Sequence, residues 1–239
     1  MRGVRGNPDA YSIRDMKNKT MAWFSILLLG VAVGWSQTPV DAEAFTVARV
    51  KYGGGGDWYN DASMIPNLLN YFQRATGLRC AEQEARVSLL DENLFVHPVL
   101  FMTGHGRIFF TDREAARLRQ YLEGGGLLFA DDDYGMDEHF RREMKKVFPE
   151  KALLAIPFSH PVFHTFYSFA KGLPKTHEHD GGSPEAWGYF HSGRLVVFYS
   201  YNANISDGWA DPEVHKDPPE VREQALQMGV NILYYALTR

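Results

Sequence analysis

Three consecutive carboxylates, Asp131, Asp132 and Asp133, directly follow the apolar run Leu127–Ala130. Carboxylate oxygens suit hard cations such as Ca²⁺, Mg²⁺ or Mn²⁺. Because neighbouring charges raise the pKa of a carboxyl group, one of the three could instead act as a general acid or base, with Asp132 as the candidate. Asp131 and Asp133 are candidate ligand contacts. In a third interpretation, one acid caps the next helix and the others are solvated.

Histidines form a second cluster in residues 160–180. His177 and His179 are two residues apart, which on a strand places both imidazoles on one face. Together with an aspartate they would make a workable site for a divalent metal ion, the one cofactor that the sequence suggests. A hydrogen-bonded loop is the alternative, because no HExxH or CxxC motif accompanies these histidines.

Only a few single residues lie where a catalytic group would be expected. His105 lies between two glycines at the end of an expected strand and is the candidate general base, with a loop histidine of no function as the alternative. Cys80 follows an expected helix rather than a strand, and the chain has no GxSxG elbow. Ordinary acyl transfer by a serine or cysteine nucleophile is therefore not expected.

The glycine-rich stretch GGGGDWYND, residues 53–61, is a candidate ligand loop. It has no GxxxxGK[ST] motif, and Trp58 stands in the place of the third glycine of GxGxxG, so a phosphate-binding loop is not indicated. Asp57 is a candidate ligand contact. Trp58 could stack on a sugar or another planar ligand, or it could simply cover the end of the sheet.

A long polar segment, residues 199–215, is the second candidate ligand loop. Unstructured loops of this length are often functional, and we expect this one to close over the site. Asn202 and Asp207 would supply oxygen atoms to a ligand, and Trp209 would add a flat apolar face.

The elements that must position these residues alternate between strand and helix. Capping boxes at Thr111–Glu114 and Asp217–Glu220 mark the start of two helices, and Ser63 is a candidate cap for another. Strands are expected over residues 45–52, 86–90, 98–103, 127–130 and 194–201, and helices over residues 65–72, 111–122, 137–148 and 217–237.

Single helices between strands predict an α/β fold with a mainly parallel, twisted sheet flanked by helices. In such sheets ligands bind outside the carboxyl ends of the strands. Four segments directly follow an expected strand, so we expect them to face one crevice. They are residues 53–57, 104–106, 131–133 and 202–207.

The N-terminal part of the chain has the layout of a secretory signal. Two lysines precede the uncharged segment Met21–Trp35, which is shorter than the roughly 20 apolar residues of a membrane span. We expect residues 1–36 to be a signal peptide and residues 37–44 a short linker, with residues 45–239 as one exported domain of the periplasm or cell envelope. An uncleaved anchor is the alternative. Residues 1–15 precede a second candidate start, Met16.

The net charge of the chain indicates which binding partners to expect. Loss of residues 1–36 removes five basic and two acidic residues, which leaves 20 basic and 27 acidic residues and a net charge of −7. Neither nucleic acid nor an anionic membrane surface is an expected partner of such a chain, so a membrane would be met only through an uncleaved N-terminal segment. With Cys80 alone no internal disulfide forms, and the domain depends on its core.

Several long motifs resemble one protein family. They are VARVKYGGGGDWYND, FMTGHG, RQYLEGGGLLFADDDYGMDEHFRREM, HEHDGG and YSYNANISDGWADPEVHKDPPEVR. They are similar to a bacterial family of secreted or membrane-tethered domains of unknown function, which is assigned to the class I glutamine-amidotransferase-like (flavodoxin-like) superfamily. The resemblance covers Phe45 to the C-terminus and implies that fold.

The resemblance also bears on activity. In active amidotransferases a cysteine occupies the sharp strand-to-helix turn, whereas the comparable turn here presents Asp131–Asp133, which argues against glutamine hydrolysis. The segment HPVFHTFYSFAKGLP is similar to a stretch of the trehalose-utilisation-type branch of the superfamily. This similarity suggests a carbohydrate-related ligand.

Two hypotheses for function follow. In the first, the chain is a binding or scaffold module of the cell envelope and recognises a polyhydroxylated, carbohydrate-like ligand or an envelope protein. In the second, it is a metal-assisted hydrolase in which His105, His177, His179 and one of Asp131–Asp133 hold the ion. The sequence does not decide whether the protein is an enzyme.

Overall fold

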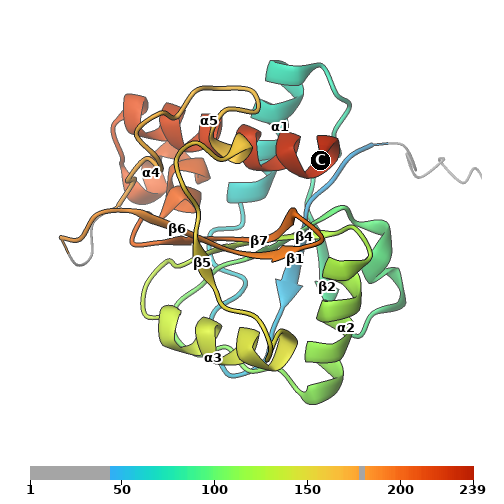
Figure 1. Ribbon diagram of the computed structural model, residues 1–239. Coiled ribbons are helices and arrows are strands. Elements are labelled where there is room, and N and C mark those ends of the chain that lie inside the picture. Colours follow the sequence, from blue (N-terminus) through green and yellow to red (C-terminus); the bar gives the residue numbers. More distant parts are fainter. Residues whose placement is uncertain (1–43, 178–180) are drawn as a thin grey trace, which may run out of the picture. The chain divides into compact units, whose positions relative to one another are not determined.

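The centre of the fold is one β-sheet with helices on both faces (Figure 1). The computed structural model describes residues 44–177 and 181–239, and within them seven strands follow the order β2-β1-β3-β4-β7-β6-β5. The order of the parallel strands, 2-1-3-4-5 with β7 counted fifth, is that of flavodoxin-like doubly wound sheets. The predicted α/β fold with a mainly parallel sheet is confirmed. The parallel strands are β1 (Ala48–Lys51), β2 (Ala85–Ser88), β3 (Val99–Met102), β4 (Leu127–Asp131) and β7 (Arg194–Tyr201).

Two antiparallel strands that the sequence analysis did not predict extend the sheet beyond β7. β6 (Glu185–His191) pairs with β7, and β5 (Leu154–Ala155) pairs with β6. The turn between β6 and β7 has a positive φ at Ser192 (50°) and at Gly193 (78°), as two-residue hairpin turns of type I′ require. The Ser-Gly pair before a strand was the available signal for this hairpin.

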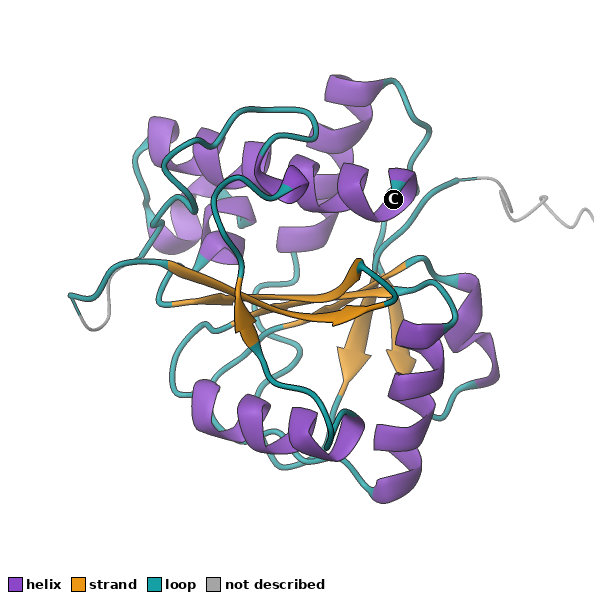
Figure 2. Ribbon diagram, viewed as in Figure 1, coloured by secondary structure: helices purple, strands orange, loops and turns teal. Residues whose placement is uncertain are grey.

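The long helices form one layer on each face of the sheet (Figure 2). α1 and α5 cover one face, and α2 and α3 cover the other. Along β3, Val99 and Phe101 enter the core on the first face, while Leu100 and Met102 enter the core on the second. The long helices are α1 (Met64–Thr76), α2 (Asp112–Glu123), α3 (Asp137–Val147) and α5 (Pro219–Thr238).

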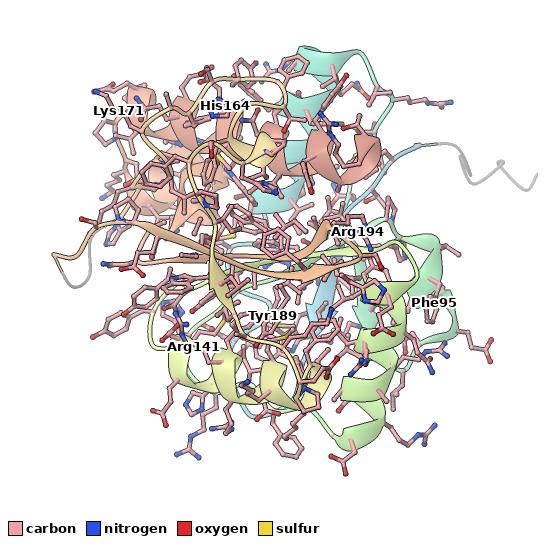
Figure 3. The ribbon with its side chains drawn as sticks, viewed as in Figure 1. Phe95, Arg141, His164, Lys171, Tyr189 and Arg194 are labelled. Atoms are coloured by element: carbon pink, nitrogen blue, oxygen red, sulfur yellow. The ribbon has the colours of Figure 1, made fainter. Side chains whose placement is uncertain are left out.

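Aromatic side chains attach β6 to α3. The Tyr189 ring lies between the sheet and this helix, 5.3 Å from the ring of Phe148 (Figure 3). The guanidinium of Arg141 on α3 lies 4.9 Å from the ring of Trp187, within the range of a cation–π contact. These contacts hold the antiparallel extension on the helical layer.

Residues 199–215 are folded, so the prediction of a polar loop that closes over the site is wrong. After β7 the chain forms the 3₁₀-helix η3 (Ile205–Trp209), which is buried throughout, and the short helix α4 (Pro212–His215). η3 packs against α5 and α1. Two further 3₁₀-helices are η1 (Glu92–Val96) and η2 (Pro161–Phe163).

Trp209 explains why this segment is buried. Its ring lies 5.6 Å from those of Phe101 and Phe129, inside the core on the α1 and α5 face. Its Nε1 donates a hydrogen bond to the Ala225 carbonyl at 2.9 Å, so burial leaves the indole N–H satisfied. Trp209 is therefore a core residue and presents no face to a ligand.

The helix caps agree with the sequence analysis in part. The capping box of Thr111 and Glu114 is present at the start of α2. The Ser63 hydroxyl instead accepts a hydrogen bond from the Asp211 N–H at 3.0 Å. The predicted capping box at Asp217 is wrong: α5 begins at Pro219 without a side-chain cap. Consecutive prolines have no N–H groups to satisfy there.

Arg49 on β1 is a buried cation that ties the sheet to the glycine-rich loop. Its Nε lies 2.8 Å from the carboxylate of Glu84, which is also buried. Its Nη1 donates to the carbonyls of Trp58 and Asn60 at 3.3 and 3.0 Å. Because a buried charge must be paired, Arg49 fixes the path of this loop.

The N-terminal region lies mostly outside the described residues. Residues 1–43 hold the predicted signal peptide and nearly all of the predicted linker. Among residues 44–177 and 181–239, the helices are all too short or too polar to cross a membrane.

Arg49→Met is expected to lower the free energy of unfolding by about 3–5 kcal/mol, because it leaves a buried carboxylate without its buried partner. Arg86→Met is the matched control: Arg86 also pairs with Glu84, at 2.7 Å, but its side chain is 46% exposed. The control is expected to lose less than about 1 kcal/mol. Urea denaturation of both variants measures the difference. Equal stabilities would show that the Arg49 pair does not hold the loop.

Candidate functional site

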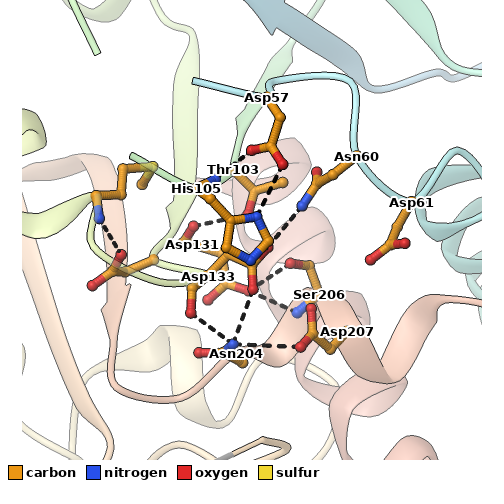
Figure 4. Close-up of polar contacts among 12 residues, drawn as sticks. Asp57, Asn60, Asp61, Thr103, His105, Asp131, Asp133, Asn204, Ser206 and Asp207 are labelled. Carbon is orange, nitrogen blue, oxygen red and sulfur yellow. Dashed lines mark hydrogen bonds and ion pairs between the residues drawn. The ribbon is translucent and has the colours of Figure 1, made fainter. Parts of the chain in front are cut away.

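A histidine between two aspartates joins three of the predicted loops (Figure 4). His105, after β3, has its Nδ1 3.0 Å from Oδ2 of Asp57 in the loop after β1. Its Nε2 lies 3.3 Å from Oδ2 of Asp133, after β4. The backbone N–H of His105 also donates to Asp57, so the imidazole is fixed in position while about half of it stays exposed.

Asparagines extend this cluster to the fourth loop. Asn60 Nδ2 donates to Asp133 Oδ2 at 2.7 Å, and Asn204 Nδ2 donates to the Asp133 carbonyl at 2.8 Å. The same amide lies 3.4 Å from Asp207 Oδ2. The four segments that follow the parallel strands thus meet at one edge of the sheet. Asn204 lies in the polar segment expected to supply ligand oxygens, whereas Asn60 was not singled out in the sequence, although it lies in the glycine-rich candidate loop.

The three consecutive acids have three different surroundings. Asp131 is fully buried and accepts hydrogen bonds from the hydroxyl of Ser200 and, at 2.7 Å each, from the N–H and hydroxyl of Ser206. Asp132 Oδ1 accepts the N–H of Met136 at 2.9 Å, just before α3. Asp131 is thus a structural residue rather than a ligand contact, and Asp132 holds the turn that leads into α3, which has no side-chain cap. Of the three, Asp133 contacts His105.

Burial raises the pKa of these acids. It raises the pKa of Asp132 to about 7, and the nearby charges of Asp137, Asp131 and Asp133 add to the shift. Burial also raises the pKa of Asp131, Asp133 and Asp207, and each of the last two is raised further by the other acids of the cluster. These acids therefore hold their protons at pH values well above the usual pKa range of aspartate.

Asp57 and His105 shift in the directions expected of an ion pair. Burial opposes ionisation of Asp57, but the two hydrogen bonds and the charge of His105 lower its pKa overall. Burial likewise opposes protonation of His105, but the charges of Asp133 and Asp57 raise its pKa overall. The imidazolium is therefore favoured closer to neutral pH than for a free histidine.

A second group of donors lies beside this cluster. His215 Nε2 is 2.7 Å from Asp61 Oδ2 and 3.8 Å from Asp207 Oδ1. One ligand atom of each of these three residues lies within 4.8 Å of the other two. Among the described residues, Asp207 Oδ1 is buried without a hydrogen-bond partner.

Only one of the two predicted metal-binding histidines lies in the described part of the chain. The His177 ring lies 6.3 Å from that of His215, so it borders the second donor group. His179 lies outside the described residues. Asp61 and His215 were missed because they are far apart in the sequence, although both lie in segments that were singled out as loops.

The remaining predicted contacts lie at the rim. Trp58 is half-buried, 5.4 Å from the Tyr59 ring and 5.9 Å from the Lys51 ammonium, and it packs on the core beside the sheet. Asn202 borders a cavity of only about 20 Å³, together with Asp132 and Asp133.

The fold and site define a class: a doubly wound α/β domain with a cluster of carboxylates and histidines at the carboxyl edge of its parallel strands. The model of the family described as "Domain of unknown function (DUF4159)" matches residues 46–237, and the chain belongs to this family. No curated protein matches the chain.

Asp132→Asn is expected to flatten the dependence of stability on pH. Because the pKa of Asp132 is raised to about 7, the folded protein holds a proton between pH 4 and 7 that the unfolded chain releases. Stability should therefore fall with rising pH in this window, by at most about 1.4 kcal/mol per pH unit from this group. An asparagine can still accept the Met136 N–H, so this hydrogen bond survives the substitution.

Urea denaturation between pH 4 and 7.5 tests this expectation. Asp112→Asn is the control, because Asp112 is exposed at the start of α2. The control should keep the parental slope. A parental slope in Asp132→Asn as well would show that Asp132 is ionised throughout.

Proposed function

We propose that this domain holds a divalent metal ion between Asp61, Asp207 and His215 and uses it to hydrolyse a polar substrate. The observation that carries the proposal is the Oδ1 atom of Asp207, which is buried and without a hydrogen-bond partner in the described residues, and which faces His215 at 3.8 Å. An ionisable oxygen in that position is costly unless a cation or a proton occupies it.

The chemistry of the three donors fits such an ion. Two carboxylates and an imidazole are ligands of Zn²⁺ and of other first-row divalent metals. Two atoms that each lie about 2.1 Å from one ion are at most about 4.2 Å apart, so donors within 4.8 Å need only small side-chain movements. Three protein ligands leave a position open for water, whose pKa the ion would lower.

His105 is the candidate general acid–base residue of this site. Asp57 and Asp133 each lie beside one of its ring nitrogens and so orient the imidazole. Its pKa is raised, that is, shifted toward neutral pH, where general acid–base catalysis is most effective. The structure favours a ligand set other than the one expected from sequence. His105 is paired with carboxylates, and among the described residues the donors that lie together are Asp61, Asp207 and His215.

We further propose that the domain is exported to the cell envelope of a bacterium and belongs to the class I glutamine-amidotransferase-like superfamily. The Met21–Trp35 segment supports export, and the flavodoxin-like strand order supports the superfamily. Asp131 ends β4, and Asp132 and Asp133 follow it at the turn where the resemblance would place the cysteine of active amidotransferases. Burial raises the pKa of Cys80 to about 11, which disfavours it as a nucleophile.

A non-catalytic binding module is the second candidate. Its support is the shallow form of the crevice, where the cavity between Asp132 and Asn202 holds only about 20 Å³, and the exposed rings of Tyr59 and Tyr134. Tyr134 lies beside His105 through a backbone bridge. Exposed rings beside carboxylates would suit a polyhydroxylated ligand or an envelope protein at the surface.

Protein purified without a polyhistidine tag is expected to contain close to one equivalent of a divalent metal, measured by inductively coupled plasma mass spectrometry. Asp207→Asn and His215→Ala should lose it, because each removes one of three ligands. His191→Ala is the control for loss of a histidine, since His191 contacts Glu123 away from the site. Asp132→Asn should also keep the metal, because Asp132 is not one of the three ligands and accepts the N–H of Met136 instead.

Failure to take up Zn²⁺, Mn²⁺, Mg²⁺ or Ca²⁺ by the folded parent would refute the metal site. Binding of an oligosaccharide array by that metal-free protein, lost in Tyr134→Ala, would then support the binding module.

His105→Gln is expected to keep the metal but to lower hydrolysis by about 10²-fold or more, the usual contribution of a general base. The measurement is a screen of chromogenic esters, glycosides and phosphoesters on the metal-loaded parent, followed by rates for the variant on any substrate found. An unchanged rate at saturating substrate would remove His105 from the mechanism.

A further inference from the structure

A cationic cavity adjoins the site on the side of α3. It has a volume of about 390 Å³ and is lined by Gly54, Arg107, Ile108, Phe109, His139 and Arg142. Its walls come from the loop after β1, the loop after β3 and the first half of α3. The first two of these loops also carry Asp57 and His105 of the site.

Arg142 is held in place before any ligand binds. Its Nε lies 2.8 Å from Glu143, and its Nη2 donates to the Ile108 carbonyl at 3.0 Å. Its Nη1 lies 2.9 Å from Nδ1 of His139. A guanidinium is always a donor, so Nδ1 is the acceptor and the neutral imidazole carries its proton on Nε2. His139 therefore has a donor left for a ligand.

Arg107 is the free cation of this cavity. Its side chain is exposed and has neither an acid partner nor a hydrogen bond among the described residues. Such a guanidinium can pair with both oxygens of an oxyanion without breaking an existing contact.

The local charge is positive, although the chain as a whole has a net charge of −4. Glu143 is fully buried and is shared by two cations, Arg142 and Lys146, at 2.8 and 2.7 Å. Arg107 adds a third positive charge. The charged side chains that line the cavity, Arg107 and Arg142, are both cationic. A cationic cavity with a rigid guanidinium and a free one is suited to an oxyanion.

The wall beside Gly54 is close-packed. A Cβ atom at this position would lie 2.9 Å from the Arg107 carbonyl and from the Phe109 N–H, and the φ of Gly54 is 106°. Only glycine fits this conformation without strain. The close approach brings the loop of Asp57 against the loop of Arg107.

The cavity lies within reach of the site. Two residues of extended chain span at most about 7 Å, so the Cα atom of Arg107 lies within that distance of the Cα atom of His105. Three residues, from Gly54 to Asp57, span at most about 11 Å. A ligand of modest size can therefore occupy the cavity with one group and reach His105 with another.

We infer that this cavity binds a tetrahedral oxyanion, a phosphate or sulfate group, and that the substrate of the neighbouring site carries such a group. The extension to the substrate rests on the proposed function. Oxyanion binding itself rests on Arg107, Arg142 and His139 alone. The proposal thus narrows the substrate class from polar compounds to phosphorylated or sulfated ones.

Isothermal titration of the full-length protein with inorganic phosphate, and separately with sulfate, tests the inference. EDTA-treated protein is used, so that neither anion can bind through a metal ion. We expect saturable binding that weakens as NaCl is added, because exposed charges are screened by salt. The anion that binds with the higher affinity identifies the group that the substrate carries.

Arg107→Gln is expected to weaken this binding at least 10-fold without changing the melting temperature, because its side chain has no partner to lose. Arg113→Gln is the matched control, an exposed arginine on α2 that lines a different groove. It should bind like the parent. Equal affinities in Arg107→Gln and the parent, or no binding of either anion, would overturn the inference.

The metal content of the same preparations before EDTA treatment separates the two proposals. Metal present without anion binding would refute the oxyanion cavity and leave the proposed function standing. Anion binding without metal uptake would support the cavity and refute the metal site.

Discussion

Buried carboxylates at the carboxyl edge of the sheet impose the constraint on which the site depends, because each must obtain hydrogen-bond donors, a cation or a proton. Asp131 obtains donors from Ser200 and Ser206, so its charge fastens η3 to the end of the sheet. Asp133 obtains them from two asparagines and His105. Asp207 keeps one oxygen without a hydrogen-bond partner among the described residues. The acids that are satisfied therefore build the scaffold, and the unsatisfied oxygen points to function.

The scaffold that holds these acids depends on a second buried charge on the opposite side of the crevice. Arg49 on β1 is buried beside the ring of Phe101, and its guanidinium binds Glu84 and the carbonyls of the glycine-rich loop. That loop carries Asp57, Asn60 and Asp61, which enter both donor groups of the site. Fixed charges on both sides of the crevice thus position flexible loops to the accuracy that a metal ion or a general base needs.

Function in this fold is a property of the loops, because the same α/β sheet hosts many chemistries. Here the loops after β1 and β3 each have two functional parts. One part of each loop joins the Asp57–His105 pair, and another part lines the cationic cavity with Gly54 and Arg107. The proposed metal ligands, the proposed acid–base residue His105 and the proposed oxyanion cavity would together suit a charged substrate, with an acidic half and a basic half side by side.

The sequence by itself determined the elements whose signals are local: the capping box of α2, the bounds of β7, and the polar loops after the parallel strands. It therefore located the crevice. Only the tertiary structure decided which of three consecutive acids faces it, because this depends on donors from β7 and η3 that lie about 70 residues away. The same holds for Asp61 and His215, which are 154 residues apart. Side-chain direction at a sheet edge follows from packing between distant segments, and no local pattern records it.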